Sequence, residues 1–178
     1  KHPDLAEPAQ TEARREVFKD KFAQVPAVVV GYTGTPKRRS PDYYAILMID
    51  AILTGGESSR LYQGLVKGRQ SAIQVEANLG WPFAGPPDYR EPAVYAINVV
   101  HKPSFTGAQL VAQVEEELGK LVKEGVPPAE LERAWTFLRA QRVSEMQVSY
   151  RRAGLLAQYE LFDSNPDLIN TEMERLFA

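Results

Sequence analysis

Residues 71–80 read SAIQVEANLG, and their pattern gives the clearest indication of the fold class. Apolar and polar side chains alternate along it, and the apolar set is Ile73, Val75, Ala77 and Leu79. Because successive side chains of a strand point to opposite faces, the alternation predicts a strand with one buried and one solvated face. A strand of this kind favours an antiparallel sheet over a parallel sheet, which is covered on both sides.

Further strands are predicted on both sides of this stretch. Residues 27–32 (AVVVGY) form a short and almost wholly apolar run, and residues 93–100 (AVYAINVV) form another. A weaker strand is predicted at residues 15–19 (REVFK). The proline-rich loop 81–92 is long for a hairpin, and its Trp81 and Phe83 either contact a peptide or partner or fold back over the core.

The remaining segments have helical patterns. Ser40-Pro41 predicts the start of a helix that ends at Gly55-Gly56, and Ser58 or Ser59 predicts the cap of a shorter helix over 60–68. Later helices are expected over 106–123, 128–146, 150–162 and 166–177. In the second of these, the expected apolar face comprises Leu131, Trp135, Leu138 and Val143. This order predicts an α+β fold with an antiparallel sheet covered on one face by helices.

Composition excludes several classes of function. The chain has 178 residues, is 44% hydrophobic and 25% charged, and carries a net charge of -2, which is typical of a soluble globular protein. The charge offers no basis for binding nucleic acid, and no apolar run reaches the roughly 18–20 residues of a membrane span. The sequence contains no cysteine, which excludes disulfides, thiol catalysis and cysteine-based metal sites.

The sequence also lacks the motifs of common catalytic centres. His2 and His101 are its two histidines, too far apart for a zinc helix, and His101 is predicted to be a surface residue that ends a strand. The acidic run 115–117 is predicted to be a solvated helix face, because consecutive helical side chains diverge by about 100°. Residues 31–37 lack P-loop spacing, and residues 55–60 (GGESSR) have Arg60 in place of the last glycine of a serine-hydrolase elbow. We therefore assign no catalytic and no metal-binding residue, and leave the substrate-binding residues unassigned.

One long segment resembles a known family. Residues 47–80 (LMIDAILTGGESSRLYQGLVKGRQSAIQVEANLG) resemble the second-domain signature of the M16 zinc metallopeptidases, the insulinase, pitrilysin and processing-peptidase group. In that signature an apolar helix ends in a double glycine, a block like residues 58–62 (SSRLY) opens the next helix, and an alternating strand follows. Residues 123–135 (KEGVPPAELERAW) and 151–170 (RRAGLLAQYELFDSNPDLIN) resemble later segments of the same family.

The resemblance implies a LuxS/MPP-like metallohydrolase fold, in which α+β domains enclose a peptide chamber. It implies zinc in the parent protein, held by an H-x-x-E-H helix of an N-terminal domain, and no cofactor in this chain. An arginine and a tyrosine that the family uses in a facing domain fall on Val66 and Ile73, which are apolar, so neither role is carried over. Arg60 and Tyr62 belong to the SSRLY block and are expected to be structural.

The resulting hypothesis is a non-catalytic domain of a zinc-dependent metallopeptidase. We expect residues 1–14 to be a linker and residues 15–178 to be a single inactive M16 C-terminal-type domain, truncated at its C-terminal end. The domain would form part of the substrate chamber and of a domain or subunit interface, and the isolated chain would be inactive. The expected partners are the zinc-bearing N-terminal domain of the same parent chain, a second M16 subunit and a peptide substrate.

Two alternatives remain open at this stage. The first is a scaffold or interaction domain of a catalytically inactive M16 homologue. The second is an independent peptide-binding module that uses a strand edge and the Trp81 loop. The sequence does not define the compartment, although the resemblance is compatible with the periplasm.

Overall fold

Three strands form an antiparallel sheet in the computed structural model, which describes residues 10–80 and 92–176. They are β1 (Ala27–Tyr32), β2 (Ala72–Leu79) and β3 (Tyr95–His101), in the order β1-β3-β2. Ile97 of the central strand β3 pairs with Val30 of β1 and with Ala77 of β2. The strands predicted at 27–32, 71–80 and 93–100 are therefore confirmed, with small shifts of their ends.

A β-bulge changes which side chains of β2 are buried. The register with β3 shifts between Ala72 and Gln74, so Ile73 is the extra residue on β2. Such a residue interrupts the alternation of side chains. Ala72 consequently points into the core, whereas Ile73 is 50% exposed and Val75 is 8% exposed. The prediction that Ile73 is buried is wrong, while burial of Val75 and Leu79 is confirmed.

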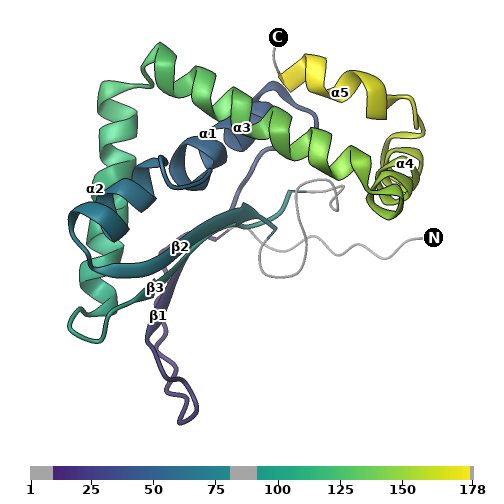
Figure 1. The fold of residues 1–178 in the computed structure, drawn as a ribbon. Helices are drawn as coiled ribbons and strands as arrows, with labels where there is room; N and C mark the ends of the chain where they lie inside the picture. The colour runs from purple at the N-terminus through teal and green to yellow at the C-terminus, as the bar shows by residue number, and fades with distance from the viewer. Residues whose placement is uncertain (1–9, 81–91, 177–178) are drawn as a thin grey trace.

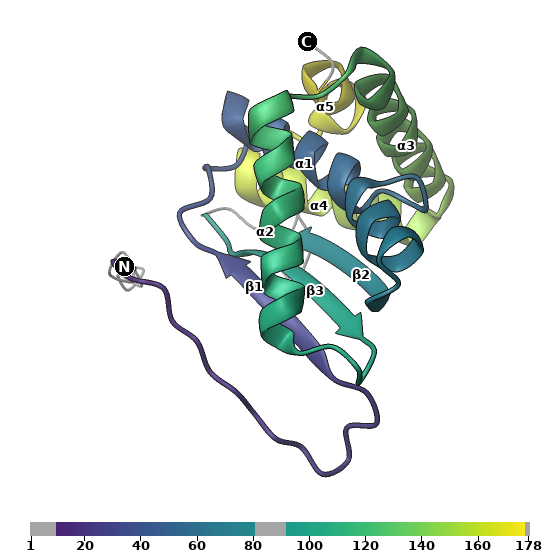
Figure 2. The ribbon, with the colours of Figure 1, turned by 90° about the vertical axis from the view of Figure 1, so that its left-hand side faces the viewer.

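One face of the sheet is covered by helix α1 (Pro41–Thr54), the π-helical segment η1 (Tyr62–Gly68) and helix α2 (Gly107–Glu124). Figure 2 shows α2 lying across this face. The side chain of Ser40 accepts a hydrogen bond from the Tyr43 backbone, and Thr106 forms a capping box with Gln109. The fully buried side chains of this core include Leu53, Leu61, Leu65, Ile97, Val99, Leu110 and Val114.

Three further helices extend away from the sheet: α3 (Pro128–Gln147), α4 (Ser149–Asp163) and α5 (Leu168–Leu176). Helix α3 packs along α1, and α4 and α5 follow at the other end of the molecule (Figure 1). A second core joins α1 to α3 and contains Met48, Ala51, Ile52 and Ala134, with Trp135 and Leu138 against it. Leu131 and Val143, which were predicted to share this face, are exposed, Val143 by 58%. That part of the prediction is wrong, because the contact with α1 involves only one section of α3.

The segment before β1 does not join the sheet. Residues 10–25 run as an extended arm outside it (Figure 2), and Val17 and Phe18 are exposed. The weak strand predicted at residues 15–19 is absent, because no neighbouring backbone pairs with it in the described part of the chain. Trp81 and Phe83 lie outside the described residues. The α+β fold with helices on one face of an antiparallel sheet is confirmed.

Candidate functional site

The main candidate site is a cleft of about 990 Å³ between α1, β2, α3 and α4. Residues 50–51 and 54–55 at the end of α1 and residues 76–78 of β2 line one part of it. The C-terminal half of α3 and much of α4 line the other part. Cavities of this size accommodate small ligands or a few residues of a peptide.

The turn between α3 and α4 and the small residues of α4 explain why the cleft is not filled by side chains. Helix α3 ends at Gln147, and Val148 takes an extended conformation that turns the chain into α4. The residues that α4 then presents to the cleft include Ala153, Gly154 and Ala157, which leave little bulk there. A Cβ atom placed on Gly154 would have no neighbouring atom within 4 Å. The turn and the small side chains together keep α4 from filling the cleft.

Asp50 carries the most strongly perturbed acidic group in this region. Its Oδ1 atom accepts hydrogen bonds from the hydroxyls of Tyr95, at 3.0 Å, and Thr54, at 3.3 Å. Burial raises the pKa of Asp50 to about 6, although these two hydrogen bonds act in the opposite direction. Burial and the neighbouring carboxylate also raise the pKa of Tyr95, which keeps its hydroxyl protonated as a donor. Asp50 also lines an adjoining cavity of about 190 Å³.

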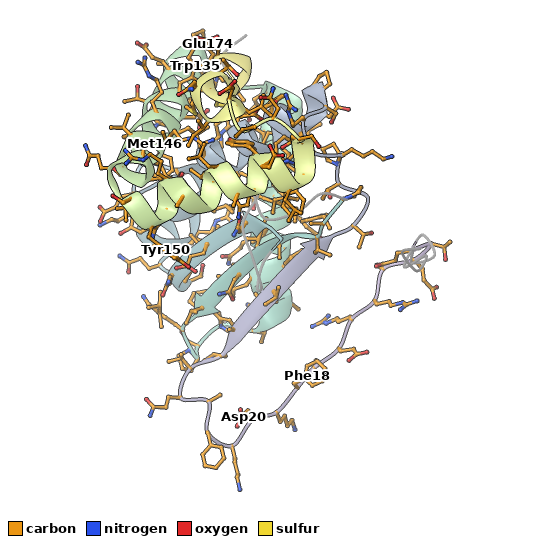
Figure 3. The ribbon with its side chains drawn as sticks, turned by 90° about the vertical axis from the view of Figure 1, so that its right-hand side faces the viewer. Phe18, Asp20, Trp135, Met146, Tyr150 and Glu174 are labelled. Carbon is orange, nitrogen blue, oxygen red and sulfur yellow. The ribbon has the colours of Figure 1, made fainter. Side chains whose placement is uncertain are left out.

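Charged and aromatic side chains line other parts of the cleft. Glu76 of β2 and Glu145 of α3 add two carboxylates to the lining, and Arg151 of α4 adds a guanidinium. Phe137 and Tyr150 supply aromatic surface, and Figure 3 places Tyr150 at the N-terminal end of α4, beside the strands. The described lining thus combines apolar and aromatic side chains with charged groups of both signs.

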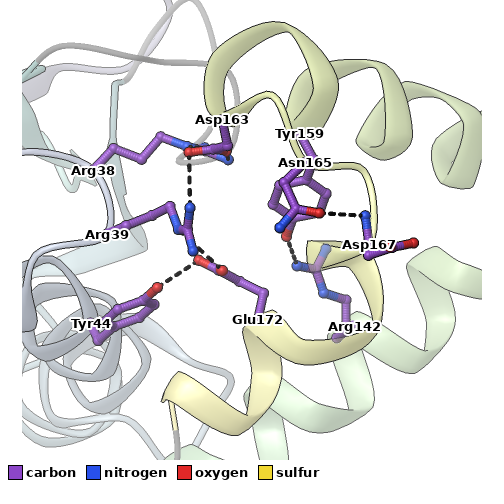
Figure 4. A network of polar contacts seen from close by, with 9 residues as sticks. All are labelled: Arg38, Arg39, Tyr44, Arg142, Tyr159, Asp163, Asn165, Asp167 and Glu172. Carbon is purple, nitrogen blue, oxygen red and sulfur yellow. Dashed lines mark hydrogen bonds and ion pairs between the residues drawn. The ribbon is translucent and has the colours of Figure 1, made fainter.

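A separate network of ion pairs holds the C-terminal helices in place (Figure 4). Arg38 Nη2 lies 3.0 Å from Asp163 Oδ2, and Arg39 Nη1 lies 3.4 Å from Asp163 Oδ1. The Tyr44 hydroxyl donates to Glu172 Oε1 at 2.8 Å. The network joins the start of α1 to the end of α4 and to α5, which gives it a structural role.

Residues that the sequence suggested as candidates lie elsewhere. His101 is 3% exposed at the end of β3, so the prediction of a surface histidine is wrong. Glu117 is 7% exposed, and its Oε1 atom lies 2.9 Å from Lys120 Nζ and 3.4 Å from Arg69 Nη2. The solvated face predicted for residues 115–117 is therefore wrong at Glu117, which points toward η1.

Thr35, Val66 and Ile73 belong to segments considered for a functional role from the sequence, and all three lie outside the cleft lining. Thr35 lies in residues 31–37, which lack P-loop spacing, and it is buried. Its hydroxyl donates a hydrogen bond to the Ala93 carbonyl oxygen and accepts one from the Ala93 backbone N–H. Val66 packs against the core and Ile73 lies at the bulge, and neither lines the cleft. Within residues 10–80 and 92–176, no group of three or more histidine or acidic side chains is placed to hold a metal ion.

Sequence reasoning missed Asp50 as a site residue. The available signal was a single carboxylate inside the apolar helical run 43–53.

None of the helices in the described ranges has both the length and the hydropathy to cross a membrane.

Comparison with known proteins identifies a family and a fold. The family model described as the peptidase M16 inactive domain matches residues 2–138. A search of curated proteins gives no match. The matched range ends within α3, so α4 and its contribution to the cleft lie beyond it.

Several solved structures resemble the chain. A protease from Helicobacter pylori has a TM-score of 0.74 at 21% identity, over 89% of this chain and 36% of that protein. A Bordetella pertussis protein named as a candidate zinc protease has a TM-score of 0.69 at 19% identity, over 86% of this chain and 79% of that protein. A peptidase M16 inactive domain from Pseudomonas fluorescens has a TM-score of 0.64 at 17% identity, over 85% of this chain and 34% of that protein. The chain thus spans about a third of the Helicobacter protein, and these identities establish a shared fold.

Proposed function

Because this chain belongs to the peptidase M16 inactive-domain family, we propose that it is the non-catalytic domain of a zinc-dependent metallopeptidase. In that role it forms part of the wall of a peptide-substrate chamber and of an interface with another domain or subunit. The match of the family model over more than half of the chain carries the proposal. The longer Helicobacter protease and the name of the Bordetella protein support it.

The residues of this chain do not fit a zinc centre. The H-x-x-E-H motif is absent from the sequence, and the ring Nδ1 of the buried His101 lies 3.0 Å from the Lys102 carbonyl oxygen. The described residues also bring no set of three ligands together. We propose that zinc, and the catalysis that depends on it, belong to an N-terminal domain of the parent chain. Residues 1–14 would be the linker and 15–178 the inactive domain.

The cleft supports a contact with peptide. It lies between α4 and the edge strand β2, and it presents apolar side chains beside carboxylates. Such a surface suits a chain of mixed side chains better than a small polar substrate. The partners of the domain would be the zinc-bearing domain, a second M16 subunit and the substrate peptide.

The proposal can be tested on the parent protein, with its active partner subunit supplied if it is one of a pair. Cleavage of a quenched fluorescent peptide library would be measured with and without residues 15–178. We expect zinc-dependent cleavage that is lost on deletion and restored when the domain is added back as a separate chain. Absence of cleavage in both forms would contradict the proposal and would favour a scaffold role in an inactive homologue.

A second measurement concerns the isolated chain of residues 1–178. We expect it to bind no stoichiometric zinc and to cleave no peptide. Proteolysis by the pure chain that a chelator abolishes would contradict the assignment of catalysis to another domain.

A further inference from the structure

Asp50 has an unused hydrogen-bonding capacity beside the cleft. Tyr95 and Thr54 both donate to its Oδ1 atom, while its Oδ2 atom takes part in no hydrogen bond or ion pair within the described residues. Asp50 lines both the cleft of about 990 Å³ and the adjoining cavity. The two hydroxyls fix the carboxyl group in place, so its second oxygen is available to a molecule in the cleft.

A carboxylate in this position is unfavourable in the empty protein. Desolvation by the surrounding core penalises the charged form, and no cation of the described chain pairs with it. A fixed and poorly solvated carboxylate binds a cation more strongly than a carboxylate in open solvent does. Its environment thus favours a positively charged ligand.

The rest of the lining defines what carries that charge. Glu76 and Arg151 add one charge of each sign to the lining, and Glu145 Oε2 lies 3.6 Å from Arg142 Nη1, so Asp50 supplies the remaining negative charge of the described lining. Ala77, Leu138, Ala153, Leu155 and Ala157 supply apolar surface suited to an alkyl chain. Phe137 and Tyr150 add aromatic surface, which favours both a cationic group and neighbouring peptide residues.

We propose that this cleft binds the side chain of a lysine or arginine residue in an extended peptide, with its cationic group at the Asp50 carboxylate. The alkyl part of that side chain lies against the alanine and leucine side chains, and adjacent peptide residues contact Phe137 and Tyr150. The inference rests on the proposed function, since it identifies a class of peptide that the chamber wall selects. It assigns a specificity-determining site to α1, β2, α3 and α4, and no step of catalysis.

The test measures peptide binding to the full parent protein, with a chelator present to prevent cleavage. Two fluorescent peptides would be compared by anisotropy, identical except for a central lysine in one and norleucine in the other. Norleucine keeps the alkyl chain and removes the charge. We expect the lysine peptide to bind about tenfold more tightly, the difference that about 1.4 kcal/mol produces.

Three variants identify the site. Asp50→Asn keeps a hydrogen-bond acceptor for Tyr95 and Thr54 but removes the charge, and should abolish the preference while the norleucine peptide still binds. Gly154→Leu adds a side chain to the cleft lining at a position where a Cβ atom has no neighbour within 4 Å, and should weaken both peptides. Asp42→Asn is the matched control, because Asp42 is an exposed residue of the same helix outside the cleft lining.

The possible outcomes distinguish the cation-binding site from the proposed chamber-wall function. Peptide binding without a preference for lysine, a preference that survives Asp50→Asn, or unchanged affinity of both peptides for Gly154→Leu would overturn the inference and leave the chamber-wall function intact. Equal affinity for lysine amide alone would indicate a small-amine site and would also overturn it. A preference found in a parent that cleaves nothing would support the inference while contradicting the proposed function.

Discussion

Arg60 and Glu130, 70 residues apart, form a two-pronged ion pair that joins the start of η1 to the first turn of α3. Arg60 Nε donates to Glu130 Oε1 at 2.9 Å, and Nη2 donates to Oε2 at 2.6 Å. Nη2 also donates to the Gly125 carbonyl at 2.9 Å, where α2 ends. One guanidinium group therefore holds three segments together, which explains the structural role of the SSRLY block.

The first prediction concerns this pair. Replacement of Arg60 by Lys keeps the charge but cannot donate two parallel hydrogen bonds and a third to Gly125. We expect Arg60→Lys to lower the free energy of unfolding by about 1–2 kcal/mol, measured by urea denaturation. Arg133→Lys is the control, because Arg133 is more exposed and lies 3.6 Å from Glu130. An equal effect of both replacements would contradict a special contribution from the hydrogen bonds of Arg60.

The second prediction concerns the pH dependence of Asp50. Its pKa rises from the ordinary 3.8 to about 6 on folding, so the folded protein binds more protons than the unfolded chain between these values. Stability conferred by this group therefore falls as the pH rises through that range. We expect Asp50→Asn to stabilise the protein at pH 8 by up to about 3 kcal/mol and to have little effect below pH 4. Urea denaturation at both pH values measures this, and an equal shift at both would contradict it.

The third prediction concerns the network at the C-terminal helices. Asp163 is buried against Arg38 and Arg39, so Asp163→Ala leaves two cations without their shared carboxylate. Loss of one partner of a buried ion pair costs about 3 kcal/mol or more. We expect a destabilisation of that order, with faster amide exchange in α5 and in the last turn of α4. Asp167→Ala, at an exposed position next to α5, should change neither quantity measurably.

The fourth prediction tests the β-bulge. Val75 is buried and Ile73 is half exposed, although both belong to the same alternating pattern. We expect Val75→Ala to cost about 1–2 kcal/mol of unfolding free energy and Ile73→Ala to cost less than half as much, although isoleucine loses more atoms. Thermal denaturation compares the two variants. A larger loss at Ile73 would place that side chain inside the core and contradict the bulge.

Helix limits and strand positions were largely predictable because local chemistry sets them. Ser40 and Thr106 cap their helices through hydrogen bonds to backbone groups three residues away, and Gly125 ends α2 with a positive φ of 73°. These interactions form within one turn of the chain, so the residue types at a fixed spacing suffice to predict them. The alternating pattern of β2 similarly predicted an antiparallel sheet.

The candidate site was less predictable, because its properties depend on distant segments. Asp50 interrupts an apolar helix in the sequence, but its environment comes from Tyr95 on β3 and from the α3–α4 turn. Glu117 sits among acidic neighbours in the sequence, yet in the folded chain it lies next to Arg69. A single-sequence pattern contains no distance between such residues, so their burial and charge balance cannot be inferred from it.

Most helices and strands, the α+β class and the family blocks could be predicted from the sequence, since capping, periodicity and motif spacing are local properties. The folded chain was needed to show that Arg60 meets Glu130, that Ile73 leaves the core and that Asp50 faces a cleft. These features could not be predicted because packing joins segments tens of residues apart. Burial and neighbouring charge, which give a side chain its energy and its chemistry, arise at those contacts.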